Sequence, residues 1–144
     1  MKSVTVTGGA GFIGSHLVDL LVRENYRVRV IDDLSNGRME NIRGHLENGT
    51  IEFHKIDLSR YDLLEEVESI VRGCTYVFHL AALADIVPSI QHPVKYHKAN
   101  IDGTVNILEA VRRNSIEKFV YTASSSCYGV PDVYPTPETA PVNP

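Results

Sequence analysis

The chain has 144 residues, of which 43% are hydrophobic, so it can bury a sizeable core and is too apolar to be disordered. Its net charge of −4 gives no electrostatic reason to expect nucleic acid or a membrane surface as a partner. Cys74 and Cys127 are too few for a disulfide framework, and the sequence shows neither a signal peptide nor a run of roughly 20 apolar residues, so we expect a soluble, cytoplasmic domain.

Short β-branched segments alternate with helical patterns along the whole chain. The expected strands, in chain order, cover residues 3–7, 27–31, 51–56, 75–81 and 118–123. A polar loop is expected over 32–49, and the proline-rich end of the chain, 130–144, should be irregular.

Three helices are expected between these strands. The first is marked by apolar residues at Ile13, Leu17, Leu20 and Leu21. The second is marked by Leu63, Leu64, Val67, Ile70 and Val71. The third covers about 94–113 and is expected to carry on its apolar side Val105, Ile107, Leu108 and Val111. Strands separated by helices need crossover connections, which predicts an α/β domain with a doubly wound parallel sheet and helices on both faces.

A glycine-rich turn, "TGGAGFIG", joins the first expected strand to its helix. Gly8, Gly11 and Gly14 would allow a tight turn, close approach of a ligand to the backbone, and close packing of the helix on the sheet. The free N–H groups at the start of that helix would then face a pyrophosphate. Because an acidic residue, Asp32, follows Gly14 by 18 positions, we interpret the turn as a dinucleotide site and not as a purely structural turn.

Asp32 would end the second strand, where a carboxylate can accept both hydroxyls of an adenosine ribose and repel a 2′-phosphate. This favours NAD over NADP, although Arg38 is near enough in sequence to receive a phosphate. Alternatively, Asp32 or Asp33 caps a turn in "IDDLSNG". Asp57 could hydrogen-bond the adenine amino group or cap the next helix.

Six motifs in order resemble the extended short-chain dehydrogenase/reductase superfamily, and more narrowly its NAD-dependent sugar-nucleotide epimerases and dehydratases. The motifs are "TGGAGFIGSHL", "IDDLSNG", the aspartate of "DLS", "VFHLAAL", "NIDGT" and "ASSSCYG". The resemblance implies a Rossmann fold, incomplete at its C-terminal side, in which Ala81 and Ala82 line the cofactor. It also implies that Asn100 supports the central helix and the site. The plainer interpretations are that packing requires small residues at the two alanine positions and that Asn100 is an ordinary polar residue inside a helix. The expected cofactor-binding residues are Gly8, Gly11, Phe12, Ile13, Gly14, Asp32, Asp33, Asn36, Asp57, Leu58, Ala81, Ala82 and Asn100.

The resemblance also implies a catalytic residue. Ser124, four positions before Tyr128, matches the serine or threonine that contacts the reacting sugar hydroxyl, and Ser125 and Ser126 are expected near the substrate. A turn-stabilising serine is the alternative. His79 is expected to be a half-buried strand residue and not a catalyst, and no group of side chains suggests a metal site.

The residues after Ser124 help to choose the reaction. Dehydratases that resemble this pattern have Asp and Glu directly after their threonine, and related decarboxylases keep a glutamate two residues before the tyrosine, whereas Ser125 and Ser126 occupy those positions here. Epimerisation needs no such carboxylate. The resemblance therefore favours an NAD-dependent 4-epimerase acting on a nucleotide sugar such as a UDP-hexose, through a transient 4-keto intermediate. A dehydratase, a decarboxylase, an NADP-linked reductase and a non-catalytic NAD-binding regulatory module remain alternatives.

The family's general base is the tyrosine of a Tyr-x-x-x-Lys motif. No tyrosine of this sequence is followed by lysine at the fourth position; they are Tyr26, Tyr61, Tyr76, Tyr96, Tyr121, Tyr128 and Tyr134. We therefore expect residues 1–144 to form part of an NAD-binding domain, with the motif and the sugar-binding part further along a longer protein. Relatives commonly pair through the helix near 94–113, which implies a homodimer.

Overall fold

The computed structural model describes all 144 residues and contains a five-stranded parallel sheet in the order β3-β2-β1-β4-β5. The strands are β1 (Ser3–Thr7), β2 (Arg27–Asp32), β3 (Ile51–Lys55), β4 (Tyr76–His79) and β5 (Lys118–Tyr121). All five expected strands are therefore present, and the doubly wound α/β class is confirmed. Three strands end earlier than expected: pairing in β3, β4 and β5 stops at Lys55, His79 and Tyr121.

The helices are α1 (Phe12–Arg23), α2 (Arg43–Glu47), α3 (Leu64–Val71), α4 (Ile86–Gln91), α5 (Pro93–His97) and α6 (Gly103–Arg112). Single turns of 3-10 helix occur at Met39–Asn41, Tyr61–Leu63 and Ser125–Tyr128. The segment between α5 and α6, Lys98–Asp102, is a π-helical turn. The expected long helix over 94–113 is thus one rod interrupted by a wider turn. No helix has both the length and the apolar composition needed to cross a membrane.

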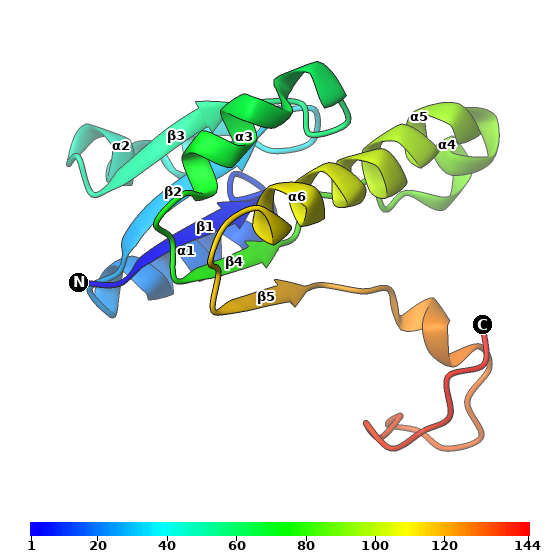
Figure 1. The fold of residues 1–144 in the computed structure, drawn as a ribbon. Coiled ribbons are helices and arrows are strands. Elements are labelled where there is room, and N and C mark those ends of the chain that lie inside the picture. The colour runs from blue at the N-terminus through cyan, green and yellow to red at the C-terminus, as the bar shows by residue number, and fades with distance from the viewer.

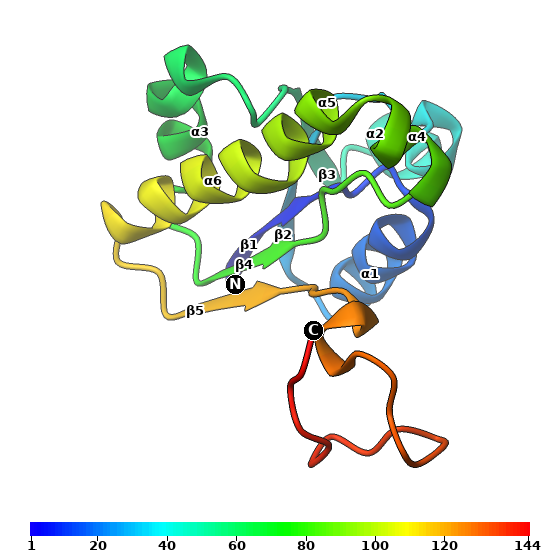
Figure 2. The same cartoon turned by 90° about the vertical axis from the view of Figure 1, so that its right-hand side faces the viewer.

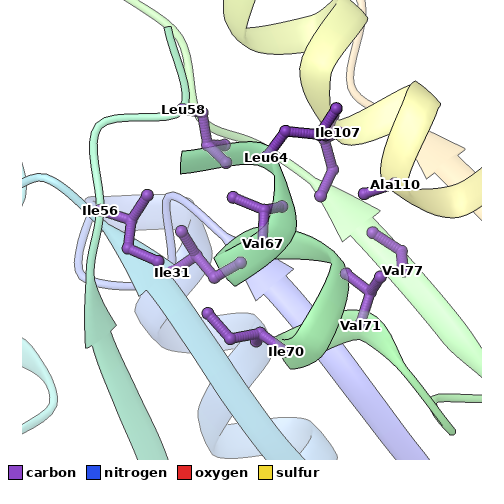
Figure 3. Close-up of a cluster of buried hydrophobic side chains, with 10 residues drawn as sticks. All are labelled: Ile31, Ile56, Leu58, Leu64, Val67, Ile70, Val71, Val77, Ile107 and Ala110. Atoms are coloured by element: carbon purple, nitrogen blue, oxygen red, sulfur yellow. The ribbon is translucent and has the colours of Figure 1, made fainter. Parts of the chain in front are cut away.

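Helices cover both faces of the sheet (Figures 1 and 2). α1 lies on one face, and α3 and α6 lie together on the other. The core under α3 and α6 joins Ile31 of β2 and Val77 of β4 to Val67 and Ile107 of the helices (Figure 3). The core under α1 includes Val4, Val6, Val28, Val30, Val18 and Leu21. Because side chains alternate along a strand, Val4 and Val6 of β1 enter the second core while Thr5 and Thr7 face the first.

Two helices bury only part of the apolar set expected for them: Leu21 of α1 and Ile107 of α6 are buried, and Leu17 and Val111 pack against the cores, but the other members are exposed. In α1, Ile13 and Leu20 are exposed, whereas the buried positions are Gly14, Ser15, Val18 and Leu21. In α6, Val105 and Leu108 are exposed, whereas the buried positions are Gly103, Asn106, Ile107 and Ala110. The reason in α6 is packing, because Ile107 and Ala110 join Leu64 and Val67 of α3 in one buried core.

The expected polar loop over 32–49 is also more ordered than its composition suggests. It contains a 3-10 turn and α2, and it is fixed by Ile42, whose side chain is completely buried in the core under α1. Leu34, Met39 and Leu46 also pack against this core, but four apolar residues without a regular period in a polar run were too weak a signal to predict this anchor. His79 differs as well, because it is fully buried instead of half-buried.

Candidate functional site

A cavity opens where β1, β2, β3 and β4 end, on the side of the sheet where open parallel sheets bind ligands. The strand order reverses between β1 and β4, so the loops after these two strands diverge and leave a crevice. Five segments contribute to its wall: the glycine turn after β1, the end of β2 with the loop that follows it, residues 56–59 after β3, residues 80–83 after β4, and Ala99 of the π-helical turn.

The glycine turn forms one end of this cavity. Gly8 has φ +69°, and an added Cβ would lie 2.7 Å from the amide nitrogen of Ala81. A Cβ on Gly14 would collide with the backbone of Gly8 and Gly9, with the Gly9 Cα only 2.8 Å away. Gly8 therefore serves the turn and the contact with residues 80–81, while Gly14 lets α1 start directly against β1.

The N-terminus of α1 points into the same region without a side-chain cap. Gly11 is the N-cap residue, it offers no side chain to cap the first N–H groups, and the first turn contains no acidic residue. The first N–H groups of a helix lack intrahelical acceptors, and their dipoles add to a positive potential. With Gly11 lining the cavity, this end of α1 is suited to an anionic group.

Asp32 lines the same cavity directly beside the glycine turn, with a relative exposure of 7%. Its Oδ2 accepts the amide of Ala10 at 2.9 Å, and its Oδ1 accepts the amide of Leu34 at 2.9 Å. Burial raises the pKa of this carboxyl, while the two amides act in the opposite direction. Each oxygen keeps a second lone pair, so Asp32 both stabilises its turn and can accept hydrogen bonds from a ligand. The turn-capping alternative is therefore observed, and the contact with a ribose stays a prediction.

The neighbouring predicted residues line the same cavity. Asp33, Asn36, Asp57, Leu58, Ala81 and Ala82 all contribute to its wall. Asp33 and Asp57 each accept the amide two residues further on, from Ser35 at 2.8 Å and Ser59 at 2.9 Å. Asp57 therefore stabilises a turn before the next helical segment, and its carboxylate is held at the rim of the cavity. Arg38 is exposed and does not line the cavity.

The other predicted residues lie outside the cavity wall. Phe12 and Ile13 begin α1 with side chains 80% and 64% exposed, so only their backbone faces the turn. Asn100 lies in the π-helical turn, where its Oδ1 accepts the Leu83 amide at 2.8 Å and its Nδ2 donates to the Leu83 carbonyl at 2.9 Å. Asn100 thus holds the main chain of Leu83, which lines the cavity, although Asn100 itself does not line it.

Ser124 lies three residues beyond the end of β5, away from this cavity. It is exposed and caps the 3-10 turn Ser125–Tyr128, since its Oγ accepts the Ser126 amide at 3.2 Å. Its hydroxyl also donates to the Ser126 Oγ at 3.0 Å. The turn-stabilising role is therefore observed, and the exposed hydroxyl remains accessible to a further hydrogen-bond partner.

Several residues of the wall had no role in the sequence analysis. The most specific is Gly37, because a Cβ there would lie 2.6 Å from Asp32 Oδ1 and 3.0 Å from the Ala10 Cβ. Gly37 therefore leaves room beside the carboxylate, and its place in "SNG" after an acidic strand end is a signal that could have identified it. The remaining ones are Ile31, Ser35, Ile56, Ser59, Leu80, Leu83 and Ala99.

These features together define a dinucleotide-binding domain of the Rossmann type: a glycine turn leading into an uncapped helix, and a buried carboxylate at the end of the second strand. Residues 4–144 match the model of the NAD dependent epimerase/dehydratase family. The chain belongs to this family.

Similar proteins and structures share the whole length of this chain. It is 39% identical over 142 residues to a putative UDP-glucose 4-epimerase of Methanocaldococcus jannaschii, covering 98% of this chain and 44% of that protein. It is 43% identical over 143 residues to the UDP-glucose 4-epimerase of Mycolicibacterium smegmatis, covering 96% and 44%. The UDP-N-acetylglucosamine 4-epimerase of Methanobrevibacter ruminantium, solved with UDP-N-acetylmuramic acid, superposes with a TM-score of 0.86 at 39% identity, covering 99% and 44%. The UDP-glucose 4-epimerase of Brucella ovis, solved with NAD, superposes with a TM-score of 0.83 at 34% identity, covering 100% and 42%. The chain therefore spans less than half the length of these relatives.

Proposed function

We propose that the protein is an NAD-dependent nucleotide-sugar 4-epimerase that acts on a UDP-hexose. The observation that carries the proposal is that one cavity is lined both by the Gly8–Gly11 turn and by the buried carboxylate of Asp32, which accepts the Ala10 amide of that turn. Relatives at 39% and 43% identity that are named UDP-glucose 4-epimerases support the reaction.

The residues of the cavity fit NAD. The amides at the start of α1 would hold the pyrophosphate, Asp32 would accept the hydroxyls of the adenosine ribose, and Asp57 would accept from the adenine amino group. The two collisions that added Cβ atoms would cause at Gly8 and Gly37 support this fit, because both occur where a ligand would approach the backbone. When bound, NAD supplies reversible hydride transfer.

Ser124 is the side chain that we assign to the sugar. Its hydroxyl can donate and accept at once, so it can orient a substrate hydroxyl and pass its proton to a base. That base is expected to be the tyrosine of a Tyr-x-x-x-Lys motif, which no tyrosine of this sequence forms. Ser125 and Ser126 would contact substrate, and their lack of a carboxyl group favours epimerisation over loss of water or carbon dioxide.

The test is to incubate the full-length protein with UDP-glucose or UDP-galactose in deuterated water. We expect the two sugars to interconvert without net NADH and without deuterium at C4, because the hydride returns from the cofactor to the sugar. Loss of water or carbon dioxide would instead indicate a dehydratase or a decarboxylase, and a preference for NADP would indicate a reductase. A protein that binds NAD but turns over no sugar nucleotide would be a regulatory module.

Substituting Asp32→Asn should weaken NAD binding about 10- to 100-fold, because charge-assisted hydrogen bonds to the ribose are lost and one of the Ala10 and Leu34 amides loses its acceptor. Affinity for NADP should fall less, since the repelling charge is removed. Calorimetric titration with both cofactors measures the change. Asp33→Asn is the matched control and should have the smaller effect, because that carboxylate is exposed. Equal losses in both variants would contradict the assignment of Asp32.

We also propose that the protein is a cytoplasmic homodimer. Val94, Ile101, Val105 and Leu108 form an apolar stripe along α5 and α6, with exposures of 68%, 52%, 57% and 43%, and their spacing is that of a helix–helix seam. The cytoplasmic location is supported by the two free cysteines, Cys74 and Cys127.

Replacing both Val105 and Leu108 by Glu should convert the full-length dimer to a monomer, because charges would be buried in the seam. Sedimentation equilibrium measures the mass. Val130→Glu, at a valine that is 93% exposed in the irregular tail, is the control and should leave the mass unchanged. A double variant that remains dimeric would remove this stripe from the interface.

A further inference from the structure

His79, the last residue of β4, is a polar side chain buried in the first core with 1% relative exposure. The groups that face its ring are the hydroxyls of Thr7 on β1 and Thr104 on α6, and the rings of Phe119 and Tyr121 on β5. None of these is a carboxylate or a basic group. Burial lowers the pKa of His79 to about 4, so the imidazole is neutral near pH 7.

The hydrogen bonds around His79 allow only one arrangement of protons. Thr7 Oγ1 accepts the Ala81 amide at 3.2 Å and shares the Leu80 amide, at 3.2 Å, with the Thr7 main-chain carbonyl at 3.1 Å, so its hydroxyl proton is free to donate to His79 Nδ1 at 2.7 Å. Thr104 Oγ1 donates to the Asn100 carbonyl at 2.6 Å, so it must accept from His79 Nε2 at 3.0 Å. Both ends therefore require the same tautomer, with the proton on Nε2.

These hydrogen bonds form a closed network around residues 80–83, the segment that forms one part of the cavity wall. One side of that segment is held by Thr7 through the Leu80 and Ala81 amides. Its other side is held by the Asn100 side chain through the amide and the carbonyl of Leu83. His79 joins the two sides, because Thr104 connects it to the π-helical turn that carries Asn100. Such turns within helices are frequent at functional sites.

We infer that His79 is a positioning residue. Its neutral ring, protonated on Nε2, links Thr7 to the π-helical turn by hydrogen bonds, and this link holds residues 80–83 against the glycine turn. A protonated ring would fit less well, because Nδ1–H would compete with the Leu80 and Ala81 amides for the Thr7 oxygen and the Thr7 hydroxyl would lose its acceptor. The fit is tight, since a Cβ on Gly8 would meet the Ala81 backbone. The inference depends on the proposed NAD site only for its effect on cofactor affinity.

The first test is nitrogen NMR of the full-length protein labelled with ¹⁵N-histidine. We expect His79 to show an unprotonated Nδ1 and a protonated Nε2, with no titration between pH 5 and pH 8. A proton on Nδ1, or titration within that range, would overturn the inference whether or not the protein binds NAD.

The second test is hydrogen exchange of the Ala81 and Leu83 amides in cofactor-free protein. His79→Phe keeps an aromatic ring beside Phe119 and should accelerate exchange of both amides at least about tenfold, because the closed network of hydrogen bonds is opened. Thr104→Val should have the same effect, and Thr104→Ser, which keeps the hydroxyl, should restore slow exchange. If His79→Phe does not fold, the two Thr104 variants decide whether the hydrogen-bonded link through His79 holds residues 80–83. Unchanged exchange in Thr104→Val would overturn the inference.

The third measurement is NAD affinity by calorimetry. The folded His79→Phe variant should bind NAD about tenfold more weakly, the effect of losing roughly one well-positioned hydrogen bond. Wild-type affinity in this variant, with exchange accelerated, would show that the wall does not contribute to binding. Wild-type protein that does not bind NAD would refute the proposed function, while the tautomer and the exchange rates would still decide the role of His79.

Discussion

Gly14→Ala should reduce the affinity for NAD by at least about 100-fold. It should also lower the free energy of unfolding by about 1–3 kcal/mol. The new Cβ would overlap the Gly8 carbonyl and lie 2.8 Å from the Gly9 Cα. All of these atoms belong to the backbone, so no side chain can rotate away and α1 itself must move. Because the amides that begin α1 also form the anion site, a displaced helix loses its alignment with the pyrophosphate.

The measurements are calorimetric titration with NAD and urea unfolding of the full-length protein. Gly44→Ala is the matched control, because Gly44 lies in α2 and an added Cβ meets nothing within 4 Å. That variant should bind NAD normally and be equal or slightly higher in stability. If Gly14→Ala bound NAD as tightly as the wild type, the close contact between α1 and the turn after β1 would be wrong.

Ser124→Ala should lower kcat for epimerisation about 10²- to 10⁴-fold, the range over which a positioned proton-transfer group contributes. The hydroxyl is exposed and hydrogen-bonded only within its own turn, to the Ser126 Oγ and amide, so it is free to engage a sugar. Losing this cap should cost about 1 kcal/mol of local stability, too little to unfold the domain. NAD affinity should not change, because Ser124 does not line the cofactor cavity.

Initial-rate kinetics with UDP-galactose separate kcat from KM for this variant. Ser124→Thr restores a hydroxyl and should recover most of the rate, which a purely structural role for the serine would not require. Ser126→Ala removes the partner of Ser124 and should cost much less. A kcat for Ser124→Ala within threefold of the wild-type value would leave Ser124 as a turn-stabilising residue only.

The parts of the molecule that the sequence predicted well are those set by local chemistry. Gly8 needs a positive φ, Gly14 needs contact with the preceding turn, and Asp32 follows a strand at a fixed distance from both. These requirements are met within about thirty consecutive residues, so they leave a pattern that can be recognised. The alternation of β-branched runs with helical patterns likewise indicated the order of elements and the parallel sheet.

Other features depend on what each segment meets in the folded chain. Residues 101–111 carry two apolar stripes, one through Ile101, Val105 and Leu108 and one through Ile107 and Val111, and periodicity alone cannot choose between them. Packing against α3 chose the second, because Ile107 and Ala110 join side chains of α3 in one buried core. His79 is similar: its two partners are 72 and 25 residues away, and only the sheet and the helix above it bring them together. Local residue patterns were therefore enough to predict the glycine turn and the succession of strands and helices, whereas contacts between distant segments fix which helix faces are covered and which polar groups pair.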